Sequence, residues 1–183
     1  MAQIIKKLNN YDKNIIVITG HMGSGKSLIG KKLAKYLNWQ HFDSDKEIEK
    51  SEEKKISEIF KDNGEKYFRD IEEIISIKSL KLNNKVIALG GGGYINPAIR
   101  KCTVQRCISF WLSWKNETII NRIQHSKKRP LAMKMSNIDL DKLINKRSTM
   151  YNLSDYKINC DKLDKKQIVK KILNFYEKSQ NKN

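Results

Sequence analysis

The sequence GHMGSGKS at residues 20–27 has the residue types and spacing of a phosphate-binding loop. It fits the pattern G-x-x-x-x-G-K-S/T and lies between an apolar β-branched run and a predicted helix. Its three glycines would let backbone amides curl around phosphate oxygens, and the helix N-terminus would add a partial positive charge. Lys26 would reach the β- and γ-phosphates, and the Ser27 hydroxyl would bind Mg²⁺. The alternative is a glycine-rich turn without a ligand, but spacing and context favour a nucleotide site.

Two carboxylates follow the second predicted strand in the sequence FDSD at residues 42–45. Asp43 and Asp45 could do different work, because one could support the Mg²⁺ shell while the other binds a substrate hydroxyl. The alternative is that this stretch only caps the next helix, which Ser44 or Asp45 could do alone. The spacing does not decide between these interpretations.

Two arginines differ in what their positions predict. Arg147 lies on the helix stripe expected to face the core, within four residues of Leu143 and Tyr151. An arginine there either extends outward to solvent or reaches into a site. Arg69 lies off the apolar stripe of its helix and has acidic residues three and four positions away. This pattern alone favours a solvated face of ion pairs for Arg69.

Four consecutive glycines, Gly90, Gly91, Gly92 and Gly93, follow the third predicted strand in a chain that has nine glycines. A turn would need one glycine. Four in succession therefore predict a backbone that approaches another group closely, with no side chain in between.

The sequence SKKRP at residues 126–130 places three consecutive cations between two predicted helices. One interpretation is a solvated basic loop. The other is a mobile flap that brings Arg129 onto the phosphates of a bound nucleotide.

An alternating pattern of strands and helices must position these residues. Such a pattern predicts one α/β domain with a parallel sheet and helices on both faces, and ligands would lie beyond the carboxyl ends of the strands. Trp111 and Trp114 are interpreted as packing residues around the fourth strand. The expected strands are 14–19, 39–43, 85–89, 106–112 and 156–159; the expected helices are two short ones within 44–64 and the segments 26–38, 65–82, 96–102, 116–125, 138–151 and 164–178.

Three helix starts carry local signals. Asn96 is a predicted N-cap, with Pro97 at the first helical position. Asp164 and Gln167 have the spacing of a reciprocal capping pair. Asn116 is the expected cap of its own helix.

Length and composition indicate a single globular domain. The 183 residues suffice for one core, and 39% hydrophobic with 31% charged residues is not the composition of a disordered chain. The chain has neither an apolar run near the roughly 20 residues of a membrane span nor a signal-peptide core. The three cysteines make neither a disulfide framework nor a metal-ligand spacing, and a cytoplasmic location suits them.

The net charge of +17 can mark a nucleic-acid binder. The basic residues are nevertheless spread through the chain, mostly as lysines on polar helix faces. This distribution indicates a compositional bias more than a binding patch, and an anionic small-molecule substrate would also benefit from the field.

The order of the motifs resembles that of the shikimate kinases. The motifs are GHMGSGKS, FDSDKEIEK, ISEIFKDNGEKYFRDIE, IALGGG, KKRPL and KRSTMY, and the match runs in register from about Asn14 to Ile172. The combination of FDSD, FRDIE and the glycines after the third strand is specific to this family. Other small-molecule P-loop kinases share only the first motif, GHMGSGKS.

The resemblance implies ATP-dependent phosphorylation of the 3-hydroxyl of shikimate, with Mg²⁺, in aromatic amino-acid synthesis. It implies a P-loop fold of the nucleoside-monophosphate-kinase type, with a five-stranded parallel sheet of order 2-3-1-4-5. The expected domain is 1–183, with a core at 14–178, substrate-binding helices at about 44–82 and a mobile lid at about 124–137. We expect the chain to be a monomer that binds ATP and shikimate and that binds neither nucleic acid nor a membrane.

The resemblance also implies roles on the substrate side. Asp45 is similar to the family's ligand of the substrate hydroxyl and candidate base. Arg69 and Arg147 are similar to the two arginines that bind the shikimate carboxylate, with Glu72 orienting Arg69. The glycine turn is similar to one whose middle glycine approaches the substrate, which implies substrate binding by Gly90, Gly91 and Gly92.

On the nucleotide side, the resemblance implies that Asp43 supports Mg²⁺ beside Ser27. Arg129 is similar to the lid arginine that reaches the phosphates, and Arg122 to a residue near the adenine. Lys26, Asp45 and Arg129 are the implied catalytic residues. The implied nucleotide-binding residues are Gly23, Ser24, Gly25, Lys26, Ser27, Leu28, Arg122 and Arg129.

Some positions depart from the family pattern. Gly93 stands where the family often has serine or alanine, and it is expected to loosen the loop without changing the chemistry. His21 replaces an apolar residue or proline, and Leu28 replaces a frequent threonine; neither is expected to affect a catalytic role. The family's late adenine contact falls near Lys162 or Leu163.

Two alternatives remain at the level of sequence. A kinase of the same fold could act on another hydroxylated acid such as gluconate, although two arginines suit a carboxylate acceptor in a closed pocket. A non-catalytic RNA-binding protein would fit the charge, but the chain lacks the aromatic stacking motifs of RNA modules.

Overall fold

Apolar β-branched residues build the centre of the sheet. The computed structural model describes residues 14–125 and 135–180. Every residue of the central strand β1 is buried, as expected for a strand covered on both faces. Within the described residues, the strands are β1 (Ile15–Thr19), β2 (Gln40–Asp43), β3 (Lys85–Ala88), β4 (Ile108–Ser113) and β5 (Tyr156–Asn159).

The strands pair in parallel in the order β2-β3-β1-β4-β5, which confirms the predicted sheet. Ile18 and Asp43 both pair with Ala88, so the carboxyl ends of β1, β2 and β3 lie level at one edge. The helices are α2 (Lys26–Leu37), α3 (Ser44–Glu52), α4 (Ile56–Ser79), α5 (Pro97–Arg106), α6 (Asn116–Gln124), α8 (Asn137–Tyr151) and α9 (Lys165–Gln180), with a short 3₁₀ turn η1 (Gly93–Ile95).

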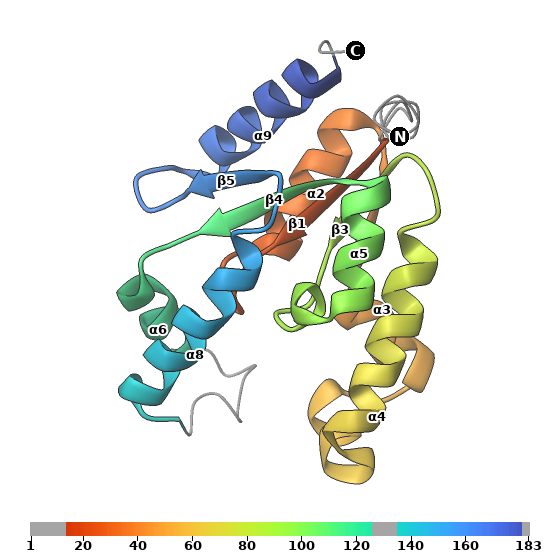
Figure 1. Cartoon of the computed structure of the whole chain (residues 1–183), viewed down its shortest axis with the longest axis vertical. Helices are drawn as coiled ribbons and strands as arrows, with labels where there is room; N and C mark the ends of the chain where they lie inside the picture. Colours follow the sequence, from red (N-terminus) through yellow and green to blue (C-terminus); the bar gives the residue numbers. More distant parts are fainter. Residues whose placement is uncertain (1–13, 126–134, 181–183) are drawn as a thin grey trace, which may run out of the picture.

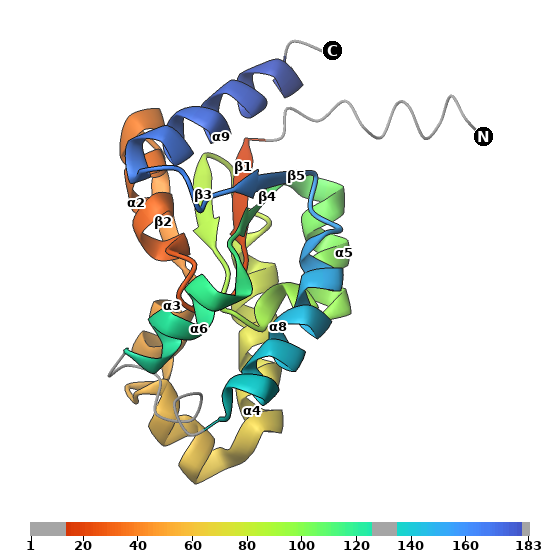
Figure 2. The same cartoon turned by 90° about the vertical axis from the view of Figure 1, so that its left-hand side faces the viewer.

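Helices cover both faces of the sheet (Figures 1 and 2). Helices α2 and α9 pack on one face, where Leu33 and Ile172 are fully buried. Helix α5, the end of α4 and Tyr151 of α8 pack on the other. Helices α4 and α8 both extend past the sheet beyond its carboxyl edge (Figure 1), so residues on both can reach groups at that edge.

The region from residue 44 to residue 82 forms the two helices α3 and α4. Gly64 has non-helical angles (φ 83°, ψ 175°) and divides α4, so the two short helices expected within 44–64 are α3 and the first part of α4. The rest of α4 is the helix expected at 65–82, but it ends at Ser79, three residues early.

Two of the three predicted helix caps are confirmed. The side chain of Asn96 accepts hydrogen bonds from the amides of Ala98 and Ile99, and Asp164 and Gln167 bond each other's amides reciprocally. The prediction for Asn116 was wrong. Lys115 is the N-cap residue of α6, without a side-chain bond. The Asn116 side chain instead donates to Asp141 and Asn145 of α8.

In the part of the chain that the structure describes, no helix has the length and apolar character that crossing a membrane would require.

Candidate active site

The phosphate-binding loop connects β1 to α2 at the carboxyl edge of the sheet. Gly23 and Gly25 have φ values of 83° and 91°, a conformation that glycine adopts without strain. The Lys26 ammonium donates to the carbonyls of Gly20 (2.8 Å) and His21 (2.9 Å). The loop therefore curls around its own lysine, and the N-terminus of α2 opens at the same point, as a phosphate site requires.

The FDSD segment lies two strands away at the same edge. Asp43 is the N-cap of α3 and accepts from the Lys46 amide (3.3 Å), whereas Ser44 accepts from the Gly90 amide (2.7 Å). The capping alternative named Ser44 or Asp45 and was wrong about both residues. Asp45 is left with a different environment, in the first turn of α3.

Asp45 is buried among charged groups of both signs. Among residues 14–125 and 135–180, no group donates a hydrogen bond to its carboxylate. Burial raises the pKa of Asp45 to about 6; nearby Lys26 lowers it, and Asp43 and Glu72 raise it. A carboxylate with this pKa can accept a proton near neutral pH, which is the property of a general base.

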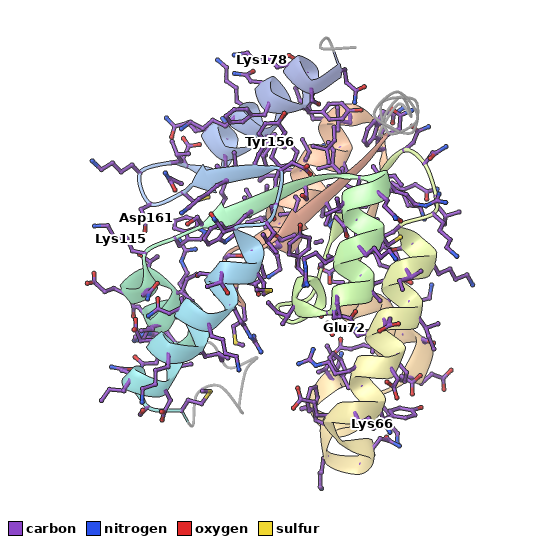
Figure 3. The ribbon with its side chains drawn as sticks, in the orientation of Figure 1. Lys66, Glu72, Lys115, Tyr156, Asp161 and Lys178 are labelled. Atoms are coloured by element: carbon purple, nitrogen blue, oxygen red, sulfur yellow. The ribbon has the colours of Figure 1, made fainter. Side chains whose placement is uncertain are left out.

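Arg69 and Glu72 of α4 form an ion pair under the glycine turn. Arg69 Nη1 lies 2.7 Å from Glu72 Oε2, and Glu72 is 1% exposed. A second pair joins Arg69 to the exposed Glu65 at 3.0 Å. Periodicity favoured a solvated face of ion pairs for Arg69. This prediction was wrong for the pair with Glu72, which is buried, although the pair with Glu65 is exposed. Figure 3 labels Glu72 on the part of α4 that approaches the glycine-containing loop.

The glycines provide space for these side chains. A β-carbon on Gly90 would collide with the Asp45 carboxylate and lie 2.9 Å from Glu72 Oε1. A β-carbon on Gly92 would collide with the Arg69 guanidinium. None of Gly90 to Gly93 has a positive φ. The predicted close approach is confirmed, and the groups approached are Asp45, Glu72 and Arg69. Gly93 has ordinary room, with Leu89 Cβ at 3.5 Å.

Helix α8 contributes Arg147 to the same glycine turn that Arg69 of α4 approaches. Arg147 Nη1 donates to the Gly91 carbonyl (3.4 Å), and the Tyr151 hydroxyl donates to the same carbonyl. Burial raises the pKa of Glu72, and the charges of Arg69 and Arg147 oppose that rise, so Arg147 lies within electrostatic range of Glu72. Of the two interpretations of Arg147, the structure thus supports an arginine that reaches into a site.

A pocket of about 690 Å³ opens on the other side of the phosphate-binding loop. Arg122 of α6 lies 3.8 Å above the Trp114 ring and donates to the Gly23 carbonyl (3.2 Å). Trp114 Nε1 donates to the Ser24 carbonyl (3.0 Å), so the role of packing alone expected for Trp114 was incomplete. The pocket is lined by Gly23, Ser24, Gly25, Leu28, Trp114, Arg122 and Leu163, among others.

Helix α6 is fixed to the loop before α9, which also borders this pocket. The Lys115 amide donates to Asp161, and the Thr118 hydroxyl donates to Asp161 Oδ1 (3.0 Å). Figure 3 labels Lys115 and Asp161 beside each other. This link holds Arg122 over the pocket. Leu163, one of two positions suggested for the late adenine contact, lines the pocket.

Ser27 and Asp43 are the residues expected to hold a magnesium ion. Ser27 is exposed in the first turn of α2, and Asp43 is 7% exposed with one backbone hydrogen bond of 3.3 Å. Hydroxyl and carboxylate oxygens are ligands that Mg²⁺ prefers, usually together with phosphates and water. The hydroxyl of Ser27 and the carboxylate of Asp43 are thus donors of the kind that Mg²⁺ accepts. The described residues hold no group of three or more histidine, cysteine or acidic side chains that could bind a metal ion. Arg129 and residues 126–134 of the expected lid lie outside the described residues.

Comparisons with known proteins identify the family of this chain. A family model described as shikimate kinase matches residues 22–177. A curated shikimate kinase from Bartonella henselae is 35% identical over 167 residues, covering 91% of this chain and 80% of the relative. The chain belongs to the shikimate kinase family.

Solved structures place the fold within the same family. A shikimate kinase from Acinetobacter baumannii, in complex with shikimate, superposes with a TM-score of 0.85 and 28% identity, covering 95% of this chain and 97% of that chain. A gluconokinase from Sinorhizobium meliloti has a TM-score of 0.55 and 15% identity over 92% of this chain and 94% of its own, which shows only a shared fold. The kinase family and the P-loop fold predicted from the motifs are confirmed.

Sequence reasoning missed three residues of this shikimate-kinase-like site. It assigned Trp114 and Tyr151 to packing positions and gave His21 no role. His21 is 3% exposed, its carbonyl accepts from Lys26, and its ring contacts Tyr151. The only sequence signal for His21 was its departure from the family pattern inside the loop motif.

Proposed function

We propose that this protein transfers the γ-phosphoryl group of ATP to the 3-hydroxyl of shikimate, in aromatic amino-acid synthesis. The observation that carries the proposal is the convergence of Arg69, Arg147 and Asp45 around one glycine turn beside the phosphate-binding loop. Two guanidinium groups suit a planar carboxylate, and a separate carboxylate suits a hydroxyl. Shikimate has both groups on one rigid ring. The related enzyme from A. baumannii was solved with shikimate, which supports the same acceptor here.

On the acceptor side, Arg69 and Arg147 hold the shikimate carboxylate. Glu72 keeps the Arg69 guanidinium in place, because its buried carboxylate lies 2.7 Å from Nη1. Asp45 binds the 3-hydroxyl and accepts its proton as the oxygen attacks the γ-phosphorus. The bond from the γ-phosphorus to the β–γ bridging oxygen breaks, and ADP leaves.

On the donor side, Lys26 and the loop amides bind the phosphates, and the adenine enters the pocket beside Arg122 and Leu163. When bound, Mg²⁺ neutralises charge on the β- and γ-phosphates, with Ser27 and Asp43 as the residues that would hold it. Arg129, from the expected lid, adds a further positive charge at the phosphates. Positioning and charge neutralisation supply most of the catalysis in phosphoryl transfer.

An acceptor panel tests the proposal. ADP release is measured with ATP and Mg²⁺ in the presence of shikimate, gluconate or quinate, each as the sole acceptor. We expect turnover with shikimate at least about 100-fold above that with the others, because a site built for paired carboxylate and hydroxyl groups rejects misplaced ones. Turnover of gluconate but not shikimate would overturn the proposal.

The proposal extends to a cytoplasmic monomer. The three cysteines are free, which suits a reducing compartment. The donor and acceptor sides described above come from one chain, so the proposed site needs no residue from a second copy.

A further inference from the structure

The side chain of His21 lies between the phosphate-binding loop and helix α8. It is 3% exposed. Its Nε2 atom shares a hydrogen bond of 3.0 Å with Ser148 Oγ, 127 residues away in the sequence. The His21 ring also meets the Tyr151 ring edge-on, with centroids 4.7 Å apart. Ser148 and Tyr151, on one turn of α8, therefore both contact the side chain of His21, the second residue of the loop.

The main chain of His21 faces the other way, into the loop. Its carbonyl accepts from the Lys26 ammonium at 2.9 Å and from the Ser24 amide at 3.1 Å. The main chain of His21 is thus bonded to Lys26, the proposed phosphate-binding lysine, and its side chain is bonded to Ser148 of α8. A neighbouring contact joins Thr19 Oγ1 to Ser154 Oγ (3.0 Å), just before the loop and just after α8.

The same turn of α8 carries the acceptor side of the site. Arg147 precedes Ser148, and Arg147 and Tyr151 both donate to the Gly91 carbonyl. His21 consequently contacts the helix that presents a substrate-binding arginine. Burial, together with Lys26 and Arg147 nearby, lowers the pKa of His21 to about 4, so the ring is neutral at pH 7 and adds no charge to the phosphate site.

We propose that His21 is a positioning residue that fixes Arg147 and its bound acceptor relative to the nucleotide phosphates, through its hydrogen bond to Ser148. This inference rests on the proposed function. Reacting atoms in such a transfer must approach to about 3–3.5 Å in line, and a misplacement of about 1 Å lowers the rate strongly. A direct bond between the donor loop and the acceptor helix limits that error.

A double-mutant cycle tests the inference. His21→Phe keeps a buried ring against Tyr151 but removes the hydrogen bond, and Ser148→Ala removes it from the other side. We expect each single change to lower kcat/KM for shikimate about fivefold, the usual effect of one hydrogen bond, with the KM for ATP unchanged. The double variant should be no worse than the more severe single variant, because both changes remove the same bond.

Two further variants separate positioning from folding. Thr149→Ala removes an exposed hydroxyl of α8 that bonds only its own helix, and it should keep parental kinetics. His21→Gln can place an amide nitrogen near the position of Nε2, and it should recover at least about half of the parental kcat/KM if the hydrogen bond is what matters. Ser148→Ala alone carries the test if a His21 variant fails to fold.

The outcomes separate this inference from the proposed function. Single effects that multiply in the double variant would overturn it, as would parental kinetics with only a lower melting temperature. A parent without shikimate turnover would contradict the proposed function instead. The cycle would then be run with the acceptor that the panel identifies, and the same coupling between His21 and Ser148 would be expected.

Discussion

Burial raises the pKa of Asp45 into the range of ordinary assays, so a base role for this residue can be tested by pH. Its pKa of about 6 lies above the ordinary value because burial disfavours the charged form. Above pH 6 the carboxylate is ionised and can accept the hydroxyl proton; below pH 6 it is protonated and cannot. We expect kcat/KM for shikimate to fall tenfold per unit below about pH 6 and to be level above it. Asp45→Asn should lower kcat by roughly 10²-fold and abolish this dependence.

The control is the same profile measured for kcat/KM of the parent in different buffers. A parental profile that stays level between about pH 5 and pH 8 would contradict a base with this pKa. Near-parental turnover by Asp45→Asn would leave Asp45 as a hydroxyl ligand and remove the base role.

The same pKa predicts an effect on stability. The folded state binds the Asp45 proton more tightly than the unfolded chain, whose value is near 3.8. The charged carboxylate therefore destabilises the fold above about pH 6, and protonation relieves this as the pH falls. We expect Asp45→Asn to melt at a higher temperature than the parent at pH 8, with the difference shrinking towards pH 4. A difference of the opposite sign would show that Asp45 has stabilising partners in the folded protein.

Arg147 should determine the affinity for the acceptor. Removing one charge-assisted contact to a carboxylate costs about 1.5–3 kcal/mol, so Arg147→Ala should raise the KM for shikimate by about 10- to 150-fold. The KM for ATP should change less than about twofold. The neighbouring Lys146 is exposed on the same helix, and Lys146→Ala is the matched control. Equal increases in both KM values would indicate a general disturbance of α8.

At this scale the sequence predicted some residues well and others poorly. The place of Arg147 on an apolar stripe, a property of one helix, marked it as unusual but left open whether it extends to solvent or enters a site. Periodicity favoured a solvated face for Arg69, whose place in the site came only from the family resemblance, because the burial of its partner Glu72 against the glycine turn is not visible in a helical pattern. His21 and Trp114 act through contacts made 127 and 90 residues away, and no local pattern predicts those.

At the scale of elements, the glycine turn connects the two sides of the acceptor site. Its glycines are not equivalent, since a β-carbon collides with Arg69 at position 92 but has ordinary room at position 93. Gly92→Ala should raise the KM for shikimate about tenfold or more by displacing the guanidinium, an effect of the size expected for losing a charge-assisted bond. Gly93→Ala should leave KM unchanged and, by restricting the unfolded chain, add about 0.4–1 kcal/mol of stability.

Kinetics and thermal melting of the two alanine variants, measured side by side, check this. The expectation that Gly93 loosens the loop would also gain support from a stabilised Gly93→Ala. An equal loss of shikimate affinity in both variants would mean that the turn needs glycine for flexibility rather than for space.

The elements themselves were largely predictable from the sequence. Strand β5 begins and ends at the predicted residues, and the caps at Asn96 and Asp164 form because their partners are local. The prediction of a cap at Asn116 was wrong because its side chain makes a tertiary hydrogen bond to Asp141 of α8, which a local pattern does not report. The end of α4 was misplaced because the apolar pattern continues past Ser79.

At the scale of the whole molecule, alternation of strands and helices predicted a parallel sheet, but the strand order came from the family resemblance. Local patterns do not report which strands become neighbours. The net charge of +17 is suited to attracting two anionic substrates, and the effect should be screened by salt. That the protein binds no nucleic acid stays a prediction.

The sheet order brings β2, β3 and β1 side by side, so that the FDSD segment, the glycine turn and the phosphate-binding loop meet at one edge. Phosphorus NMR of a reaction with ATP, Mg²⁺ and shikimate, with ADP measured in parallel, tests this account most directly. We predict one ADP for each phosphorylated shikimate, with the phosphorus coupled to the proton on carbon 3, and no ADP release when shikimate is omitted. ADP release that does not depend on shikimate, or a phosphate on another hydroxyl, would contradict it.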